Sequence, residues 1–246
     1  MHSFLLIGQS NMAGRGFLDE AIDVDTSRIY MFRNGRWQKM FRPINPDRSF
    51  SGTSLAESFA EKYAETHDVK VGLICCADGG TTLEQWLPGN LLYDNAVAQA
   101  KLAMRTSSLS GILWHQGESD CAGGRHAVYE ANLLQMLKYL RRDLGLPDIP
   151  ILLGGLGDYL DRCPRPAWEF QNYPIINAAS QTVAKSLGNA SFVSAAGLTP
   201  NPDQLHFNAA SLYKFGLRYF DEFEKLTPVS AGAVSSDTER SEMELL

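Results

Sequence analysis

Short apolar segments alternate with longer amphipathic stretches along most of the chain, and this alternation restricts the possible folds more than any other feature. Segments such as Val69–Cys76 and Ile149–Leu153 have the length of a strand and are apolar at nearly every position. Strands of this kind are buried on both faces, which happens in parallel sheets that helices cover on each side. The pattern therefore predicts an α/β domain with a mostly parallel sheet.

Apolar runs and helical spacing locate the expected elements. Two strands flank Asn34-Gly35, a strong signal for a hairpin, and Ser54 with Glu57 resembles a capping box at a helix start. We expect strands at Phe4–Ile7, Arg28–Phe32, Trp37–Met40, Val69–Cys76, Gly111–Trp114, Ile149–Leu153 and Ser191–Ala195. We expect helices from Leu55 through Tyr63 and at Leu91–Met104, Ala127–Leu140, Ile175–Leu187 and Ala209–Phe223.

One domain accounts for most of the chain. A length of 246 residues with 44% hydrophobic side chains is enough for one full core. From Thr227 the sequence turns to Ser, Ala, Glu and Asp with little periodic apolar content. We therefore expect a domain at 1–226 and a mobile tail at 227–246.

The charge balance argues against two classes of partner. Lys and Arg number 22 against 28 Asp and Glu, a net charge of −6. Such a chain has no overall positive charge to attract nucleic acid or anionic lipid. Apolar runs fall short of the roughly 20 residues that a membrane span needs, and the first residues lack the basic start of a secretory signal. These features predict a cytoplasmic protein without nucleic-acid or membrane partners.

The cysteines show no paired spacing. Cys75 and Cys76 are adjacent on an expected strand, and Cys121 and Cys163 stand alone. We expect four reduced, buried thiols rather than a disulfide framework.

Polar segments follow several of the expected strands, where ligands bind in open parallel sheets. Gly8–Gly14 follows the first strand, Asp78–Thr82 follows the strand that ends at Cys76, and His115–Asp120 follows Trp114. A fourth polar segment, Asp203–His206, precedes the last helix. We expect these segments to meet at one edge of the sheet.

Ser10, Asp203 and His206 can form a nucleophilic site. A serine hydroxyl is a weak nucleophile unless a base accepts its proton and a carboxylate orients that base. Asp203 and His206 lie three positions apart, so both side chains can emerge on one side of a turn. Met12 stands where a nucleophile elbow would have its second glycine, which disfavours the common α/β-hydrolase fold.

Negative charge that develops on an ester oxygen needs donors held in advance. The backbone N–H groups of Ser10 and Gly80 and the Gln116 side-chain amide are our candidates. Glu118 could orient His115 or Gln116 or act as a second carboxylate for His206, and the sequence leaves these roles open. We expect His115 to be a hydrogen-bonded structural histidine.

Four blocks in order resemble one known family. They are Gly8-Gln9-Ser10-Asn11-Met12, Gly79-Gly80-Thr81, His115-Gln116-Gly117-Glu118-Ser119-Asp120 and Asp203-x-x-His206. Together they are similar to the sialate O-acetylesterases and acetylxylan esterases of carbohydrate esterase family 6, within the SGNH hydrolases. The resemblance spans about residues 3 to 225.

This resemblance implies a flavodoxin-like three-layer α/β/α fold, no metal or other cofactor, and hydrolysis of acetyl esters on carbohydrates through an acyl-serine. By position, Ser10 resembles the nucleophile, Asp203 and His206 the rest of the triad, and Ser10, Gly80 and Gln116 the oxyanion donors. The resemblance also implies that Trp86 lines the acyl or sugar pocket. The remaining residues of the matched blocks that we expect to bind substrate or support the site are Gln9, Asn11, Gly79, Thr81, His115 and Glu118.

Two other functions fit the same residues less well. One is a lipase or thioesterase of the wider SGNH group, and the other is a carbohydrate-binding domain without catalysis. The sequence has no His-Glu-x-x-His, Cys-x-x-Cys or Walker motif, so it does not indicate a zinc or nucleotide site. Arg15, which follows the nucleophile block, could contact substrate, but the default expectation is an exposed, solvated arginine.

Overall fold

The computed structural model describes residues 1–228. The strands are β1 (His2–Gly8), β2 (Ile29–Arg33), β3 (Arg36–Lys39), β4 (Val71–Cys75), β5 (Ser108–His115), β6 (Ile151–Gly154) and β7 (Ala190–Val193). The α-helices are α1 (Ser10–Ala13), α2 (Leu55–His67), α3 (Leu91–Ala103), α4 (Tyr129–Leu144), α5 (Tyr173–Leu187) and α6 (Ala209–Phe223). Short 3₁₀ turns, η1 to η7, lie at Leu18–Glu20, Leu83–Trp86, Glu118–Asp120, Arg125–Ala127, Leu160–Arg162, Pro166–Trp168 and Phe170–Asn172.

The strands form one seven-stranded sheet in the order β3-β2-β4-β1-β5-β6-β7. All neighbouring strands are parallel except β2 and β3, which form the antiparallel hairpin predicted from Asn34-Gly35. Strands β2, β3 and β4, which follow β1 in the chain, lie on one side of it, whereas β5, β6 and β7 lie on the other side. The strand order therefore reverses at β1. Ligands bind at such a reversal, beyond the carboxyl ends of the strands.

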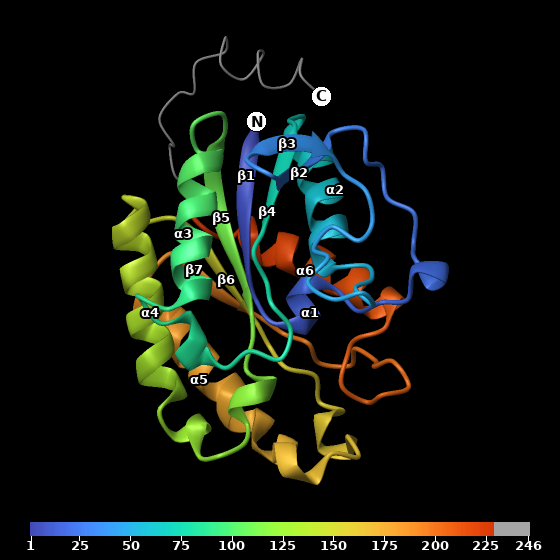
Figure 1. The fold of residues 1–246 in the computed structure, drawn as a ribbon, viewed down its shortest axis with the longest axis vertical. Coiled ribbons are helices and arrows are strands. Elements are labelled where there is room, and N and C mark those ends of the chain that lie inside the picture. Colours follow the sequence, from blue (N-terminus) through green and yellow to red (C-terminus); the bar gives the residue numbers. More distant parts are fainter. Residues whose placement is uncertain (229–246) are drawn as a thin grey trace.

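Helices cover both faces of the sheet, and the fold is therefore the predicted three-layer α/β/α arrangement (Figure 1). Helices α2 and α6 pack against each other on one face, whereas α4 packs against both α3 and α5 on the other. The strands between these layers are almost entirely buried, as their apolar sequences predict. Phe4 of β1, for example, packs edge-on against Phe59 of α2 and Phe223 of α6.

Helix α2 begins as its sequence predicts. The Ser54 hydroxyl accepts a hydrogen bond from the Ala56 N–H, and the Glu57 carboxylate accepts one from the Ser54 N–H. This capping box satisfies N–H groups that the first turn leaves free. The Ser54 hydroxyl also donates to the Met12 carbonyl at 2.8 Å, which ties the start of α2 to α1.

Several boundaries differ from the sequence-based expectations. Strand β5 starts at Ser108 rather than Gly111, because its polar first residues pair with β1 from His2 onward. Helix α4 runs to Leu144, beyond the predicted end at Leu140. Helix α6 spans the predicted residues. The mobile tail expected at 227–246 lies, from residue 229, outside the described residues.

All four cysteines are free, as expected. Cys76 and Cys121 are buried, but Cys75 and Cys163 are only partly buried. The expectation of four buried thiols is therefore correct for two of them.

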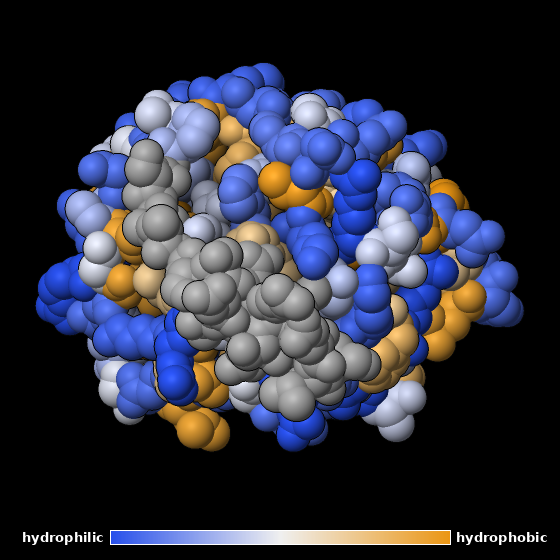
Figure 2. All heavy atoms as spheres, turned by 90° about the horizontal axis from the view of Figure 1, so that it is seen from above, coloured by the Kyte–Doolittle hydropathy of each residue, from blue (hydrophilic) through white to orange (hydrophobic). Residues whose placement is uncertain are grey.

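The end of the molecule near the chain start is mainly hydrophilic where described residues are visible, with small separate hydrophobic areas (Figure 2).

Among residues 1–228, no helix has both the length and the apolar character to cross a bilayer.

Candidate active site

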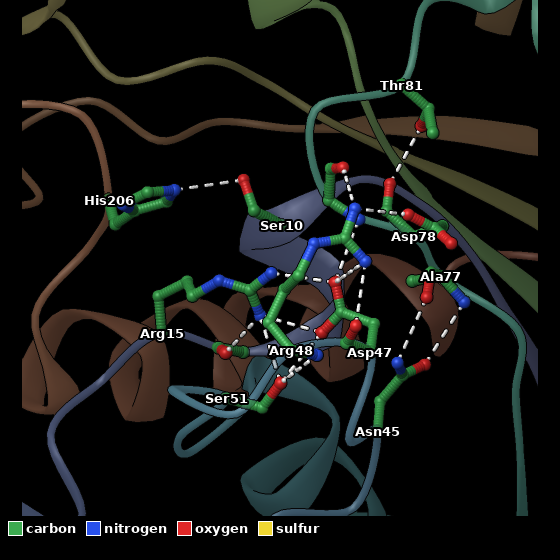
Figure 3. A network of polar contacts seen from close by, with 12 residues as sticks. Ser10, Arg15, Asn45, Asp47, Arg48, Ser51, Ala77, Asp78, Thr81 and His206 are labelled. Carbon is green, nitrogen blue, oxygen red and sulfur yellow. Dashed lines mark hydrogen bonds and ion pairs between the residues drawn. The ribbon is translucent and has the colours of Figure 1, made fainter.

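Ser10 and His206 meet at the carboxyl edge of the sheet, although 196 positions separate them in the sequence. Ser10 is the first residue of α1, directly beyond β1, and His206 lies in the loop before α6. The His206 Nε2 atom is 3.0 Å from the Ser10 Oγ atom, and the two side chains point toward each other (Figure 3). The spatial convergence predicted from the sequence is therefore present.

Asp203 holds the far side of the imidazole. Its Oδ2 atom lies 2.6 Å from His206 Nδ1, and its Oδ1 atom accepts the N–H groups of Leu205 and His206. Partial burial alone would raise the pKa of Asp203, but the hydrogen bonds from the His206 side chain and from these N–H groups outweigh it and lower the pKa to about 2. A proton on Nδ1, donated to this carboxylate, leaves Nε2 free to accept the Ser10 hydroxyl.

Asn11 joins three loops of the site. Its Nδ2 atom donates to Glu118 Oε1 at 2.6 Å, and its Oδ1 atom accepts the Phe207 N–H at 3.1 Å. Asn11 follows Ser10 and Phe207 follows His206. The side chain therefore fixes the spacing between nucleophile and base through a buried hydrogen-bond bridge.

Gln9, on the other side of the nucleophile, points back into the protein. Its Oε1 atom accepts the N–H groups of Gly117 and Ser119 at 3.3 and 3.4 Å. Gln9 and Asn11 together hold the segment after β5 against the turn that carries Ser10.

The nucleophile opens onto a cleft of about 210 Å³. The residues that line it come from all four predicted segments, from Arg15 just after the first of them, and from two further regions, 48–50 and 165–170. They are Gln9, Ser10, Arg15, Arg48, Phe50, Gly79, Gly80, Glu118, Ser119, Arg165, Trp168, Phe170, Leu205 and His206.

Two backbone N–H groups are available at this cleft. Within residues 1–228, neither the Ser10 N–H nor the Gly80 N–H has a hydrogen-bond partner. Gly80 has a positive φ of 78°, and a Cβ there would meet nothing within 4 Å, so the space beside its Cα is open. A Cβ on Gly79 would lie 2.5 Å from Arg15 Nη2 and 3.4 Å from Ser10 Cβ, so only glycine fits beside the nucleophile.

Arg15 is buried, contrary to the expectation of an exposed arginine. Its guanidinium forms a two-pronged ion pair with Asp47, at 2.9 and 2.7 Å, and both side chains are only 4% exposed. Burial alone would raise the pKa of Asp47, but the hydrogen bonds and the charge of Arg15, together with bonds from Ser51 and Gly79, hold it below its ordinary value. Arg15 is buried because the loop before α2 places the Asp47 carboxylate beneath the turn that carries Ser10.

Asp47 connects this ion pair to the loop that carries Gly80. Its Oδ2 atom accepts the Gly79 N–H at 2.8 Å, and Arg48 donates to the Gly79 carbonyl and to the Asp78 carboxylate at 2.9 Å each (Figure 3). The neighbouring Asn45 holds both the N–H and the carbonyl of Ala77. The segment 45–48 thus fixes the peptide groups immediately before Gly80.

The Gln116 side chain does not face the cleft, which corrects its expected role as an oxyanion donor. Its Nε2 atom donates to the Thr81 carbonyl at 3.0 Å and to the Asp120 carboxylate, so both of its N–H bonds are in use. Its Oε1 atom accepts the Tyr129 hydroxyl at 3.1 Å. Gln116 is buried and braces the loop at Thr81 from behind.

Trp86 does not line the cleft either. Its ring is 1% exposed, packs edge-on against Trp114, and donates through Nε1 to the Thr81 hydroxyl at 3.1 Å. The Thr81 hydroxyl in turn donates to the Asp78 carbonyl at 2.8 Å. Trp86 and Thr81 therefore support the loop that carries Gly80, because the turn after Thr82 points the indole into the core.

His115 is a buried structural residue, as expected, but it is not hydrogen-bonded. Neither ring nitrogen has a hydrogen-bond partner within residues 1–228, and the ring packs against Phe207 and Phe215. Burial lowers the pKa of His115, although the charge of Glu118 opposes this, so the imidazole is held neutral. The Glu118 Oε1 atom is 3.9 Å from His115 Nε2, and its only short contact is with Asn11 among the described residues.

Among residues 1–228, no group of three or more His, Cys, Asp or Glu side chains is arranged to hold a metal ion. The reactive groups that converge are a hydroxyl, an imidazole and a carboxylate beside two free N–H groups. This arrangement, at the carboxyl edge of a doubly wound sheet, has the geometry that nucleophilic ester hydrolysis by a serine would need.

Comparison with known proteins identifies the family. Residues 1–225 match the model of the family described as carbohydrate esterase, sialic acid-specific acetylesterase. The chain belongs to this family. It is also 28% identical over 240 residues to the probable carbohydrate esterase At4g34215 of Arabidopsis thaliana, covering 87% of this chain and 86% of that protein.

Solved structures share the fold. The X-ray structure of the Arabidopsis thaliana protein AT4G34215 has a TM-score of 0.78 at 25% identity and covers 91% of this chain and 98% of that one. NanS has a TM-score of 0.70 at 17% identity, covering 91% and 96%. A lipase/acylhydrolase from Enterococcus faecalis has a TM-score of 0.57 at 17% identity, covering 94% and 100%. The fold is therefore that of the SGNH lipases and acylhydrolases.

Sequence reasoning missed several residues of the cleft. Asp47 and Arg48 lie in a loop with no periodic pattern, and nothing in the sequence marks Asp47 as the partner of Arg15. Phe50 and Trp168 are large aromatic residues outside the expected elements. That position was a usable signal, because an aromatic side chain in a loop often contacts a ligand or partner.

Proposed function

We propose that this protein hydrolyses acetyl esters of carbohydrates through an acyl-Ser10 intermediate. The observation that carries the proposal is the chain of contacts from Asp203 to His206 Nδ1 and from His206 Nε2 to Ser10 Oγ. Membership of a carbohydrate esterase family supports the substrate class.

Acylation starts when the Ser10 Oγ atom attacks the ester carbonyl carbon and its proton passes to His206 Nε2. The negative charge on the carbonyl oxygen is stabilised by the N–H groups of Ser10 and Gly80. His206 then gives the proton to the sugar oxygen as the bond from carbon to that oxygen breaks. Asp203 keeps the imidazole oriented and stabilises its charged form throughout.

Deacylation repeats these steps with water. His206 Nε2 takes a proton from water as the water oxygen attacks the acetyl-serine carbonyl carbon. The bond from carbon to Ser10 Oγ breaks, the proton returns to Oγ, and acetate leaves.

Acetate release from a panel of acetylated sugars tests this proposal. The panel contains acetylated xylo-oligosaccharides and O-acetylated sialic acid, and Ser10→Ala is the paired variant. We expect the wild type to release acetate from at least one of them and Ser10→Ala to lose at least about a thousandfold in kcat with its fold intact. A Ser10→Ala variant that keeps the wild-type rate overturns the mechanism.

A lipase or thioesterase is the second candidate. The size and lining of the cleft argue against it, because about 210 Å³ bordered by Arg15, Arg48 and Arg165 suits a short acyl group on a polar alcohol. Hydrolysis of acetate, butyrate and octanoate esters decides between them. A strong preference for chains longer than butyrate would remove the acetylesterase proposal.

A carbohydrate-binding domain without catalysis is the third candidate. An unactivated serine does not react with an organophosphonate, whereas a serine beside a base does. Labelling of Ser10 in the wild type, and its absence in His206→Ala, would exclude a purely binding role.

A further inference from the structure

Two large aromatic side chains lie exposed in the same cleft as Ser10 and His206. Trp168 is 39% exposed and Phe50 is 68% exposed, and both line the cleft. Neither ring takes part in the contacts that join Asp203, His206 and Ser10. Exposed apolar rings inside a cleft leave hydrophobic surface in water, which binding of a ligand would remove.

The Trp168 ring is held in place by what lies beneath and beside it. It stacks on Phe170, with ring centres 5.9 Å apart and planes 19° apart, and Phe170 is only 3% exposed. On either side of Phe170, the Glu169 carboxylate accepts the Gly123 N–H at 3.2 Å and the Asn172 amide donates to the Cys121 carbonyl at 2.9 Å. The segment is thus anchored to the loop after Glu118, and a ligand that stacks on Trp168 does not have to order it.

Phe50 belongs to the network under the nucleophile. The guanidinium carbon of Arg15 lies 5.3 Å from the centre of its ring. The next residue, Ser51, donates from its hydroxyl to Asp47 at 2.8 Å and accepts the Arg48 N–H at 3.1 Å. Phe50 is therefore placed by the same contacts that fix the loop before Gly80.

Arg165 adds hydrogen-bond donors to this part of the cleft. Arg15 and Arg48 are engaged by Asp47 and Asp78. Within residues 1–228, the Arg165 guanidinium has no hydrogen bond or ion pair. Aromatic faces beside free polar donors match a pyranose ring, which has apolar C–H faces and a rim of hydroxyls.

We propose that Trp168 and Phe50 form a subsite for the pyranose ring that carries the acetyl ester, with Arg165 donating to its polar rim. This inference rests on the proposed function and names the part of the cleft that distinguishes a sugar ester from a simple ester. The residues act on binding of the sugar portion and do not touch the bonds that break.

The test compares two substrates of one reaction. An acetylated pyranoside carries the ring, whereas ethyl acetate carries the same acyl group without it. We expect Trp168→Ala and Phe50→Ala to raise KM for the pyranoside about tenfold, and Trp168→Ala to change kcat/KM for ethyl acetate by no more than about twofold. Trp168→Phe should restore much of the affinity, because it keeps an aromatic face.

Phe41→Ala is the matched control, because Phe41 is 48% exposed and does not line the cleft. It should leave both substrates unchanged. If the wild type cleaves the pyranoside and both cleft variants keep its KM, the subsite is wrong and the proposed function stands. Equal losses on the two substrates would also overturn the subsite, because they indicate a structural role. A wild type that cleaves ethyl acetate but no acetylated sugar overturns the proposed function, and the subsite with it.

Discussion

The Arg15 guanidinium and the Asp47 carboxylate form a buried ion pair, 2.7 Å apart, under the turn that carries the nucleophile. Because Asp47 also accepts the Gly79 N–H, the pair links the segment after β1 to the loop after β4. The nucleophile and the open N–H of Gly80 are thus positioned by a single charged unit.

Replacing Asp47 by Asn should destabilise the protein and impair catalysis together. The substitution leaves the Arg15 charge buried without its partner, which costs about 3–5 kcal/mol of unfolding free energy. It also loosens Gly79, so kcat should fall as well. Urea unfolding and steady-state kinetics measure the two effects.

Asp78→Asn is the control for this variant, because it breaks an exposed pair with Arg48 and should cost less than about 1 kcal/mol. Since the pKa of Asp47 is lowered in the folded state, its stabilising contribution is complete above the ordinary Asp value and is lost as the pH falls through the lowered one. Equal stability of Asp47→Asn and wild type near neutral pH would contradict this account.

Gly80→Ala should slow turnover more than it destabilises the fold. Gly80 and Gly89 both have a positive φ and open space around a Cβ, so Ala at either position should cost about 1 kcal/mol. Relaxation of φ at Gly80 also moves the unpaired N–H of a residue that lines the cleft, and we expect kcat to fall at least about tenfold.

Gly89→Ala, at a residue that does not line the cleft at Ser10, serves as the reference in the same kinetic assay. If the two variants retain the same kcat, the Gly80 N–H does not stabilise the transition state.

Asp203→Asn should lower kcat about ten-thousandfold while leaving KM nearly unchanged. The amide cannot hold His206 in the tautomer that leaves Nε2 unprotonated. Because the pKa of Asp203 is about 2, its carboxylate stays charged in mild acid. Protonation of Asp203 should therefore cause no loss of wild-type activity in mild acid. A wild-type activity profile from pH 4 to 9, set beside that of Asp203→Asn, checks this point.

Asn11→Ala should lengthen the distance between the Ser10 hydroxyl and the His206 imidazole. It removes the acceptor of the Phe207 N–H and the donor to Glu118, both buried, at a cost of about 2–3 kcal/mol. We expect a larger fall in kcat than in the affinity for a product sugar, because the bridge sets the Ser10–His206 spacing.

Asn11→Asp is the informative comparison for this bridge. It keeps the acceptor for Phe207 but places a carboxylate against Glu118, so it should be at least as damaging at neutral pH. Wild-type kcat in either variant would show that the spacing is set elsewhere.

The strands and longer helices could be predicted because burial dictates their sequences. Val71–Cys75 is apolar because both faces are covered, and Ala209–Phe223 is amphipathic because only one face meets α2. The start of β5 could not be predicted, because Ser108 is in the strand only through its pairing with β1. The sequence around a residue does not indicate which distant strand that residue will pair with.

The same limit applies to the site. The convergence of Ser10, His206 and Asp203 was predictable, because the chemistry expected of them requires those residue types at strand ends. The direction of a side chain was not predictable where a buried partner decides it. Gln116 turns away because Asp120 and Thr81 occupy its amide, and Trp86 turns inward to pack on Trp114.

The nucleophile stands near one end of the described chain and its base near the other, 196 positions away. Neither half of the polypeptide alone contains a working centre. During synthesis or refolding, the reactive pair comes together only once the central strand has been flanked on both sides and the last helix has docked. Recovery of ester cleavage after dilution from denaturant would therefore indicate that the whole sheet has formed. Partly folded species would have no activity in that assay.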